Sequence, residues 1–174
     1  MFEEYLTSKG LPVACSLEEL NNKYPGQKYD LITSFFVLEH IQEPVAFILS
    51  LIDLLAPGGA LVMEIPNAMD ALRTLYPCKA FKDFYWSIAH PWYFTPDSFN
   101  FLLKEKCGFR QYRIIEDQRY DMCNHVQWLL EGKPGGQGRF NQIFDTLFTD
   151  YFKRSLINSH HSDTLIAFVT DDRV

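Results

Sequence analysis

The sequence predicts an α/β fold built on a mostly parallel sheet, and three observations carry this prediction. Residues Tyr29–Phe36 and Ala60–Ile65 are nearly continuous apolar runs, which is typical of parallel strands buried on both faces. Between them, a segment that opens at Pro44 carries apolar residues at helical spacing and indicates a crossover helix. Pro57-Gly58-Gly59 then supplies turn chemistry before the second run. A strand, a helix and a strand in this order favour an α/β domain.

The segment before these strands predicts two short helices and a strand. Residues Phe2–Lys9 have helical character and are followed by Gly10, a typical residue after a helix end. Pro12–Cys15 is predicted as a short strand. Ser16, with Glu19 three residues later, forms a capping-box pattern that predicts a helix to about Asn22.

The second half of the sequence predicts further elements in alternation. Thr95 and Pro96 are typical of a helix start, and Gly108 ends that helix. The apolar residues from Phe140 to Phe152 recur at helical spacing and predict an amphipathic helix. The other predicted elements are a strand over Gln111–Asp117, a helix over Asp121–Leu130 and a last strand over Thr164–Thr170.

Composition limits the classes of function. The chain has 174 residues, 47% of them hydrophobic, which suits one globular domain. Its net charge of −6 and pI of about 5.3 disfavour a nucleic-acid partner. No apolar stretch is long enough to span a bilayer, and the acidic N-terminus is unlike a secretion signal. The scattered cysteines predict reduced thiols in a cytoplasmic protein, and the histidines and cysteines lack metal-ligand spacing, so no metal site is predicted.

Four short motifs then occur in order. Tyr29–Ile41 resembles the fourth-strand motif of class I (Rossmann-like) S-adenosylmethionine-dependent methyltransferases, and Leu55–Leu61 resembles their turn into the fifth strand. Ile65-Pro66-Asn67 is similar to the end of that strand. His90–Pro96, followed by Cys107-Gly108-Phe109, resembles the entry and exit of the next helix. The resemblance covers Leu11 to about Asp117 and the final strand, and it implies that S-adenosylmethionine is the cofactor.

The sequence also departs from this family. Family members begin with a strand and a Gly-x-Gly-x-Gly loop that contacts the cofactor, then a second strand that ends in an acidic residue for the ribose. Neither feature is found before Leu11. The resemblance therefore implies an incomplete Rossmann-like sheet without its first two strands, helices on both faces, an antiparallel late strand and an unpaired strand edge. We expect a truncated chain that binds the cofactor weakly or not at all and is inactive by itself.

The resemblance implies which residues approach the cofactor and the reacting atoms. Cys15, Ser16 and Leu17 fall beside the expected adenine position, and Ser34, Phe35 and Phe36 fall where family members surround the methionine portion. Glu39 and His40 come next, at the mouth of the site. A histidine with a pKa near 7 suits a hydroxyl acceptor that must lose a proton, so His40 is a candidate base.

Residues 67–94 are dense in aromatic side chains and are predicted to be an acceptor-side insertion in a single partial domain of residues 1–174. Within it, His90 is the second candidate base, and Asn67, Trp92 and Tyr93 are candidate acceptor contacts. Residues 119–162 are predicted to be a helical insertion before the last strand. The stretch from Asn124 to Gly136 is similar to a subgroup associated with bacterial polysaccharide and sugar methylation.

The function expected from the sequence is methyl transfer to a small acceptor, with a hydroxyl of a sugar or polysaccharide precursor preferred. A nicotinamide dehydrogenase is the first alternative, but its Gly-x-Gly-x-x-Gly loop is not found in the sequence. A non-catalytic remnant that binds or dimerises is the second. A homodimer would form through the exposed sheet edge or through the aromatic helix over Phe140–Phe152.

Overall fold

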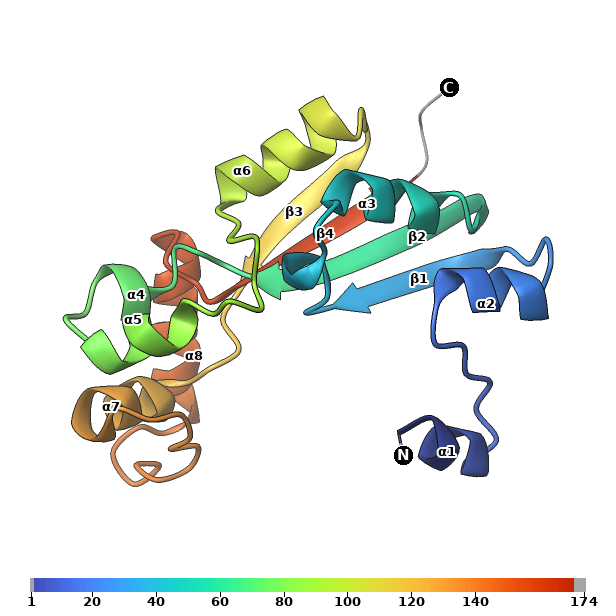
Figure 1. The fold of residues 1–174 in the computed structure, drawn as a ribbon. Helices are drawn as coiled ribbons and strands as arrows, with labels where there is room; N and C mark the ends of the chain where they lie inside the picture. The colour runs from blue at the N-terminus through green and yellow to red at the C-terminus, as the bar shows by residue number, and fades with distance from the viewer. Residues whose placement is uncertain (1, 171–174) are drawn as a thin grey trace.

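The computed structural model describes residues 2–170, which form one four-stranded sheet with helices around it (Figure 1). The strands lie in the order β1-β2-β4-β3. Their bounds are β1 (Tyr29–Phe35), β2 (Leu55–Pro66), β3 (Tyr112–Asp117) and β4 (Thr164–Thr170). β1 and β2 are parallel, whereas β4 is antiparallel to both β2 and β3. Three strands therefore run in one direction and the last is reversed, which confirms the predicted α/β sheet.

The helices fall into groups that Figure 1 separates clearly. α3 and α6 lie over the sheet, whereas α4, α5, α7 and α8 lie beyond the carboxyl ends of β1 and β2. The α-helices are α1 (Phe2–Ser8), α2 (Leu17–Lys23), α3 (Pro44–Ile52), α4 (Ala71–Thr74), α5 (Lys79–Tyr85), α6 (Pro96–Phe101), α7 (Met122–Glu131) and α8 (Thr146–Asn158). Two short turns complete them: a 3₁₀ turn η1 (Leu38–His40) and a π-helical turn η2 (Leu102–Lys106) that extends α6.

Several predicted helix ends are confirmed by their hydrogen bonds. Ser16 Oγ accepts the Glu19 backbone N–H at 3.0 Å at the start of α2. Thr95 and Ser98 form a reciprocal capping box at the start of α6. The helix predicted over Asp121–Leu130 is α7, and it ends at Gly132, whose left-handed conformation would strain a side chain.

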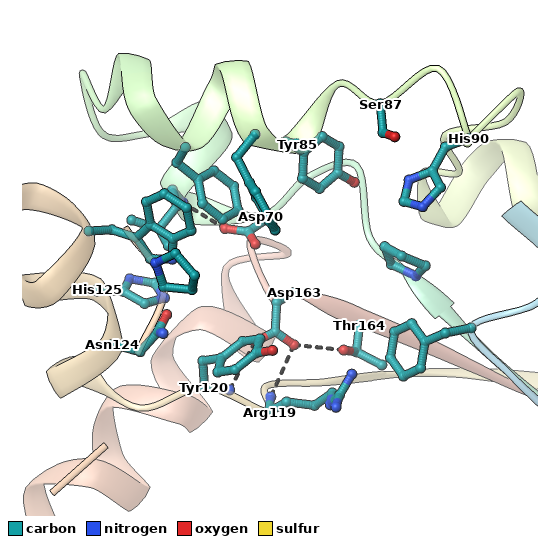
Figure 2. Close-up of a pocket in the computed structure, with 17 residues that line it drawn as sticks. Asp70, Tyr85, Ser87, His90, Arg119, Tyr120, Asn124, His125, Asp163 and Thr164 are labelled. Carbon is teal, nitrogen blue, oxygen red and sulfur yellow. Dashed lines mark hydrogen bonds between the residues drawn. The ribbon is translucent and has the colours of Figure 1, made fainter. Parts of the chain in front are cut away.

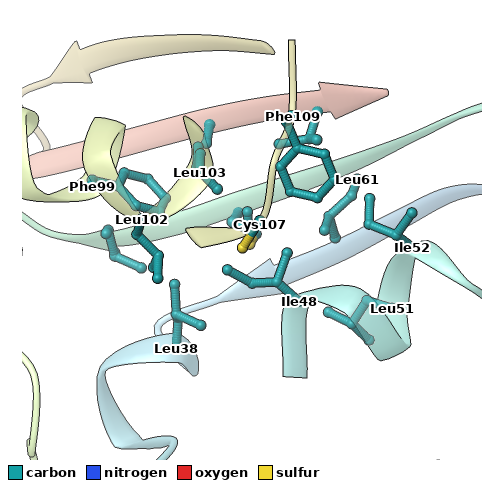
Figure 3. Packing of buried hydrophobic residues seen from close by; sticks show 14 of the residues in the cluster. Leu38, Ile48, Leu51, Ile52, Leu61, Phe99, Leu102, Leu103, Cys107 and Phe109 are labelled. Atoms are coloured by element: carbon teal, nitrogen blue, oxygen red, sulfur yellow. The ribbon is translucent and has the colours of Figure 1, made fainter. Parts of the chain in front are cut away.

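The main hydrophobic core lies between the sheet and the two helices α3 and α6 (Figure 3). Ile48 and Ile52 from α3 meet Phe99 from α6 and Leu61 from β2, and all four are buried. Both crossovers, from β1 to β2 and from β2 to β3, run the same way across the sheet. Right-handed crossovers in one direction place their helices on the same face. The crossover helices α3 and α6 therefore share one face of the sheet, whereas the resemblance implied helices on both faces.

The β1 edge is unpaired in the described chain, as the resemblance implied, but one face of β1 is more exposed than its apolar run predicts. β1 stands at the end of the sheet order, so it is an edge strand. Leu31 and Phe35, whose side chains lie on the face away from α3, are 59% and 52% exposed. The apolar run of β1 was predicted to be buried on both faces, and this prediction is wrong: β1 pairs on one side only, with β2, and the face that carries these two side chains is exposed.

Three further predictions need correction. Pro12–Cys15 forms no strand, because no neighbouring strand pairs with it in the described chain. β2 begins at Leu55 rather than at Ala60, and Pro57-Gly58-Gly59 lies inside the strand. The aromatic helix begins only at Thr146, because Asp145 caps α8 and the chain before it forms turns. Ile143, at 72% exposed, thus precedes the helix rather than lying on it.

The two predicted insertions meet in a second hydrophobic cluster. Leu72, Cys78 and Phe81 from residues 67–94 pack with Trp128 from α7, and all four are buried. The cluster lies beyond the strand ends and therefore positions the residues described below. No helix among the described residues is long and apolar enough to cross a membrane.

Candidate functional site

A cavity of about 430 Å³ lies at the carboxyl ends of β1 and β2. In Figure 2, Asp70, Tyr85 and His90 lie on one side of it, and Arg119 and His125 lie on the other. The two sides come from residues 67–94 and 119–134, which the second hydrophobic cluster holds together. Ligands of open α/β sheets bind at this end of the strands, and the volume suits a small molecule.

The cavity reaches the end of β1 through Phe36. This residue has φ of 54°, in the left-handed region that a bulky residue rarely adopts. The Arg119 guanidinium lies 4.3 Å from the centre of the Phe36 ring, so a cation and an aromatic face stack at the strand ends. A second cation contact joins Arg119 to Glu64, with Nε and Oε1 3.8 Å apart.

The buried carboxylate of Asp163 organises the loop that carries Arg119. It accepts the backbone N–H groups of Arg119 and Tyr120, each at 3.0 Å. Gln118 Nε2 at 2.7 Å and Thr164 Oγ1 at 2.7 Å also donate to it. Burial raises the pKa of Asp163, and these hydrogen bonds act against that rise. Asp163 therefore holds the cavity wall in place.

Asp70 is the most strongly perturbed acid that lines the cavity. Its Oδ1 accepts the Leu72 backbone N–H at 2.7 Å and caps α4. Burial, together with the nearby charge of Asp163, raises the pKa of Asp70 to about 7, although the Leu72 hydrogen bond and Arg73 act in the other direction. A carboxyl group with a pKa near neutrality can accept and return a proton at physiological pH.

Glu39, His40 and His90 come together in space, and His90 is the one of the three that lines the cavity. The His40 and His90 rings pack edge to face with centroids 4.4 Å apart. His40 Nδ1 lies 2.9 Å from the Ala89 carbonyl oxygen. Burial and the neighbouring His40 lower the pKa of His90, and burial raises the pKa of Glu39. The structure thus joins three residues that the sequence placed in two separate motifs.

Aromatic side chains form much of the remaining wall. Trp128 packs against Phe81 with ring centroids 5.1 Å apart, and against Phe84 at 5.2 Å. His125 is buried between the rings of Tyr76 and Phe152, and its Nδ1 has no hydrogen-bond partner in the described part of the chain. Burial lowers the pKa of His125 to about 4. Such walls suit a ligand with a flat or ring-shaped portion.

The predicted cofactor residues do not share one cavity. Ser34 is buried near the end of β1, and its Oγ has no hydrogen-bond partner among the described residues, while Phe36 lines the cavity. Cys15 and Ser16 are exposed, and Leu17 lines a separate apolar groove between α2 and β1. Only the end of β1 therefore meets the described cavity.

The predicted acceptor contacts are placed differently from one another. Asn67 is fully buried; its Oδ1 accepts the Met69 N–H and its Nδ2 donates to Ser162. Tyr93 Oη accepts the Ser87 backbone N–H at 2.6 Å and so fixes the loop before His90. Trp92 is partly exposed and stacks on Phe94. These three residues support the wall, and none of them lines the cavity.

Sequence reasoning missed Asp70, Arg119, Asp163 and His125. Asp70 follows the end of β2 and Arg119 follows the end of β3, so both lie just beyond strands that run in the same direction. Asp163 precedes β4, and the start of an antiparallel strand lies at that same edge. The strand order was therefore the signal that would have located them. His125 carried no comparable signal.

Comparisons with known proteins agree with this architecture. A family profile described as a methyltransferase domain matches residues 11–112. The tRNA U34 carboxymethyltransferase of Hydrogenovibrio crunogenus is 33% identical over 116 residues, which are 65% of this chain and 32% of that protein. The chain thus spans about a third of the length of this curated relative.

One solved structure shows the same fold at low sequence identity. The plantazolicin methyltransferase BamL, solved with a triazolic desmethylPZN analog and SAH, superposes with a TM-score of 0.50 at 14% identity. That match covers 96% of this chain and 63% of BamL. A SAM-dependent methyltransferase from Archaeoglobus fulgidus is also 14% identical, with a TM-score of 0.46, and the match covers 98% of this chain and 80% of that one. From the match over residues 11–112, which is more than half of its length, the chain belongs to the methyltransferase domain family.

Proposed function

We propose that the chain takes part in methyl transfer to a hydroxyl group of a small, ring-bearing acceptor held in the cavity between Asp70 and Arg119. A sugar or polysaccharide precursor is the acceptor class we prefer. The observation that carries this proposal is a cavity of about 430 Å³ in which aromatic walls surround a carboxyl group with a pKa of about 7. Aromatic faces bind sugar rings, and a hydroxyl needs a base to become a nucleophile.

S-adenosylmethionine, when bound, supplies a methyl group on a sulfonium, and an acceptor oxygen would bond to this methyl group in line as S-adenosylhomocysteine leaves. The residues of this chain would then align the acceptor and remove its proton. Alignment accounts for much of the rate of such a displacement. Asp70 would take the hydroxyl proton as the oxygen–methyl bond forms, and Arg119 and Asp163 would keep the opposite wall in place. His90, which lines the cavity, and His40 beside it are the alternative bases.

The expected cofactor contacts belong to the same proposal. Ser34, Phe35 and Phe36 would contact the methionine portion, which the unpartnered Ser34 Oγ supports. Cys15-Ser16-Leu17 would lie near the adenine. Because Cys15 and Ser16 are exposed and apart from the cavity, we expect cofactor binding to this chain to be weak. Calorimetric titration with S-adenosylhomocysteine tests this: a dissociation constant near 1 μM, about −8 kcal/mol, contradicts weak binding.

The test of function is methyl transfer from labelled S-adenosylmethionine to a panel of nucleotide-sugars, sugars and tRNA, followed by mass spectrometry. With a sugar hydroxyl as acceptor, Asp70→Asn should lower the rate by about 10²- to 10⁴-fold, which is the usual contribution of a general base. Asp145→Asn is the matched control, because it makes the same exchange at the exposed cap of α8. Methylation that is as fast in Asp70→Asn as in the unchanged chain would refute the base assignment.

A tRNA acceptor is the competing outcome of this panel. The curated relative named as a tRNA carboxymethyltransferase favours it. The net charge of −6 favours a small acceptor, because binding to a phosphate backbone depends on cationic side chains. Modification of tRNA, with no modification of sugars, would replace the acceptor class that we propose.

A second candidate function is a binding or dimerisation module. It is favoured by Ile143, Leu147 and Tyr151, which are 72%, 79% and 71% exposed on and just before α8. Two copies could cover these side chains or pair their β1 edges. Light scattering would give twice the mass of 20.3 kDa for such a module, and Leu147→Glu would return it to a monomer if α8 forms the interface. A monomer at all concentrations would exclude the dimer.

A further inference from the structure

Three side chains with metal-ligand chemistry come together in space. Each of Glu39, His40 and His90 offers one ligand atom, and these atoms all lie within 4.8 Å of one another. Glu39 and His40 are adjacent in η1, whereas His90 lies in the loop before α6. Because 50 residues separate the two histidines, spacing in the sequence does not reveal the group.

The environment of Glu39 indicates that its carboxylate is placed to bind a cation. The residue is 3% exposed, and its Oε2 has no hydrogen-bond partner among the described residues. A buried carboxylate is normally paired or bound to a metal, since its desolvation is otherwise costly. No lysine or arginine among the described residues forms an ion pair with it, and the cation-forming group nearest to it is the His40 ring.

The hydrogen bond of His40 fixes which of its nitrogens faces Glu39. A carbonyl oxygen only accepts, so Nδ1 must donate its N–H to the Ala89 oxygen at 2.9 Å. In the neutral ring, Nε2 then carries a lone pair and lies 3.9 Å from Glu39 Oε1. A proton or a metal cation between them would relieve the repulsion of two acceptors that face each other. Metal-binding histidines characteristically donate their second nitrogen to a carbonyl or carboxylate in this way.

His90 completes the group from the other side. It follows Ala89 directly, and its ring packs edge to face on His40. In the described part of the chain, neither ring nitrogen of His90 is assigned a hydrogen bond. The residue also lines the cavity, so a ligand that it holds is open to the acceptor position.

We propose that Glu39, His40 and His90 bind one divalent first-row transition metal ion, for which zinc is the reference and cobalt the spectroscopic probe. Two imidazoles and one carboxylate are a preferred ligand set for such ions, and three protein ligands leave coordination positions open. Tetrahedral ligands at bond lengths of 2.0–2.1 Å lie about 3.3 Å apart. The ligand atoms, which all lie within 4.8 Å of one another, therefore have to approach by up to about 1.5 Å on binding.

The role of this metal rests on the proposed function, whereas its binding does not. An ion bound there would present its open positions to the cavity that His90 lines. An acceptor hydroxyl bound to the ion would lose its proton more easily, because metals lower the pKa of a bound oxygen. Asp70, which lines the same cavity, would then receive that proton.

Cobalt titration of the chelator-treated chain tests the binding directly. We expect one equivalent of Co²⁺ to bind, with visible absorption bands of four- or five-coordinate cobalt that one equivalent of Zn²⁺ removes. His40→Asn and His90→Asn should each weaken binding at least tenfold. Glu39→Gln should do the same while keeping the size of the buried side chain. His160→Asn is the matched control, because His160 is an exposed histidine paired with Glu116 outside the group, and it should bind cobalt as the unchanged chain does.

The outcomes separate clearly. No binding, or binding that survives both His40→Asn and His90→Asn, would overturn the proposal. Equal loss in His160→Asn would indicate binding elsewhere and would also overturn it. Because circular dichroism of each variant shows whether it is folded and no methyl transfer is measured, failure here leaves the proposed methyl transfer untouched. A chain that binds cobalt but methylates nothing would refute only that function.

Discussion

Replacing Asp70 by asparagine should stabilise the chain at neutral pH and change its stability little at pH 4. In the folded chain, burial raises the pKa of Asp70 from 3.8 to about 7. At pH values between 3.8 and about 7, the folded state therefore keeps a proton on Asp70 that the unfolded state has released. Stability is highest below pH 3.8 and declines as the pH rises to about 7, above which the loss is complete. At about 1.4 kcal/mol per pKa unit, the full loss is about 4 kcal/mol.

Asparagine removes this loss without removing the cap. Its side-chain oxygen can still accept the Leu72 N–H, and asparagine caps helices about as well as aspartate. Urea unfolding at pH 4 and pH 8 would measure the difference. We expect Asp70→Asn to gain about 2–4 kcal/mol at pH 8 and less than about 1 kcal/mol at pH 4. The control Asp145→Asn should change stability by less than about 1 kcal/mol. A gain that is equal at both pH values, or a loss at pH 8, would refute the assignment of a buried, protonated Asp70.

Three further changes test the packing. His125→Phe should be more stable than the unchanged chain by up to about 3 kcal/mol at pH 4 and about equally stable at pH 7, because burial lowers the pKa of His125 to about 4 and the folded chain therefore loses stability as the pH falls below 6.5. A difference in urea unfolding that does not change with pH would contradict this. Gly59→Ala should lower the free energy of unfolding by about 2 kcal/mol or more, because a Cβ would lie 2.9 Å from the Tyr29 carbonyl oxygen and near two other backbone oxygens. The change would be measured as a lower Tm, and an unchanged Tm would show that the strands can separate. Phe99→Ala should lower the free energy of unfolding in urea by about 3–5 kcal/mol, because the Phe99 ring of α6 is fully buried in the core. A loss below about 1 kcal/mol would argue against that packing.

Local chemistry predicted the elements whose signals lie within a few residues. The cap of α2 at Ser16, the cap of α6 at Thr95 and the end of α7 at Gly132 all follow from side-chain or backbone preferences of single residues. The strand over Thr164–Thr170 was predicted with its bounds as the structure has them. Periodicity was less reliable for the aromatic stripe from Phe140. The apolar spacing continues through residues that form turns, and Asp145 caps the helix only at Thr146.

The candidate site was predicted where the resemblance gave a motif. Glu39, His40 and His90 were named from two separate motifs and meet in space. Asp70 and Arg119 were missed, because their importance depends on burial and on a neighbour far away in the chain. A carboxyl group acquires a raised pKa only when the fold removes it from water, and no spacing in the sequence records that.

The sequence by itself determined the class of the fold, the order of most elements and the membership of the methyltransferase domain family. These features depend on hydrophobic runs, caps and short motifs, each of which is continuous in the chain. Only the tertiary structure decided which side chains share the cavity, which carboxyl groups are buried and that one face of β1 is exposed. The physical reason is that burial and electrostatic coupling arise between residues such as His40 and His90, which folding brings to 4.4 Å between ring centres across 50 positions of sequence.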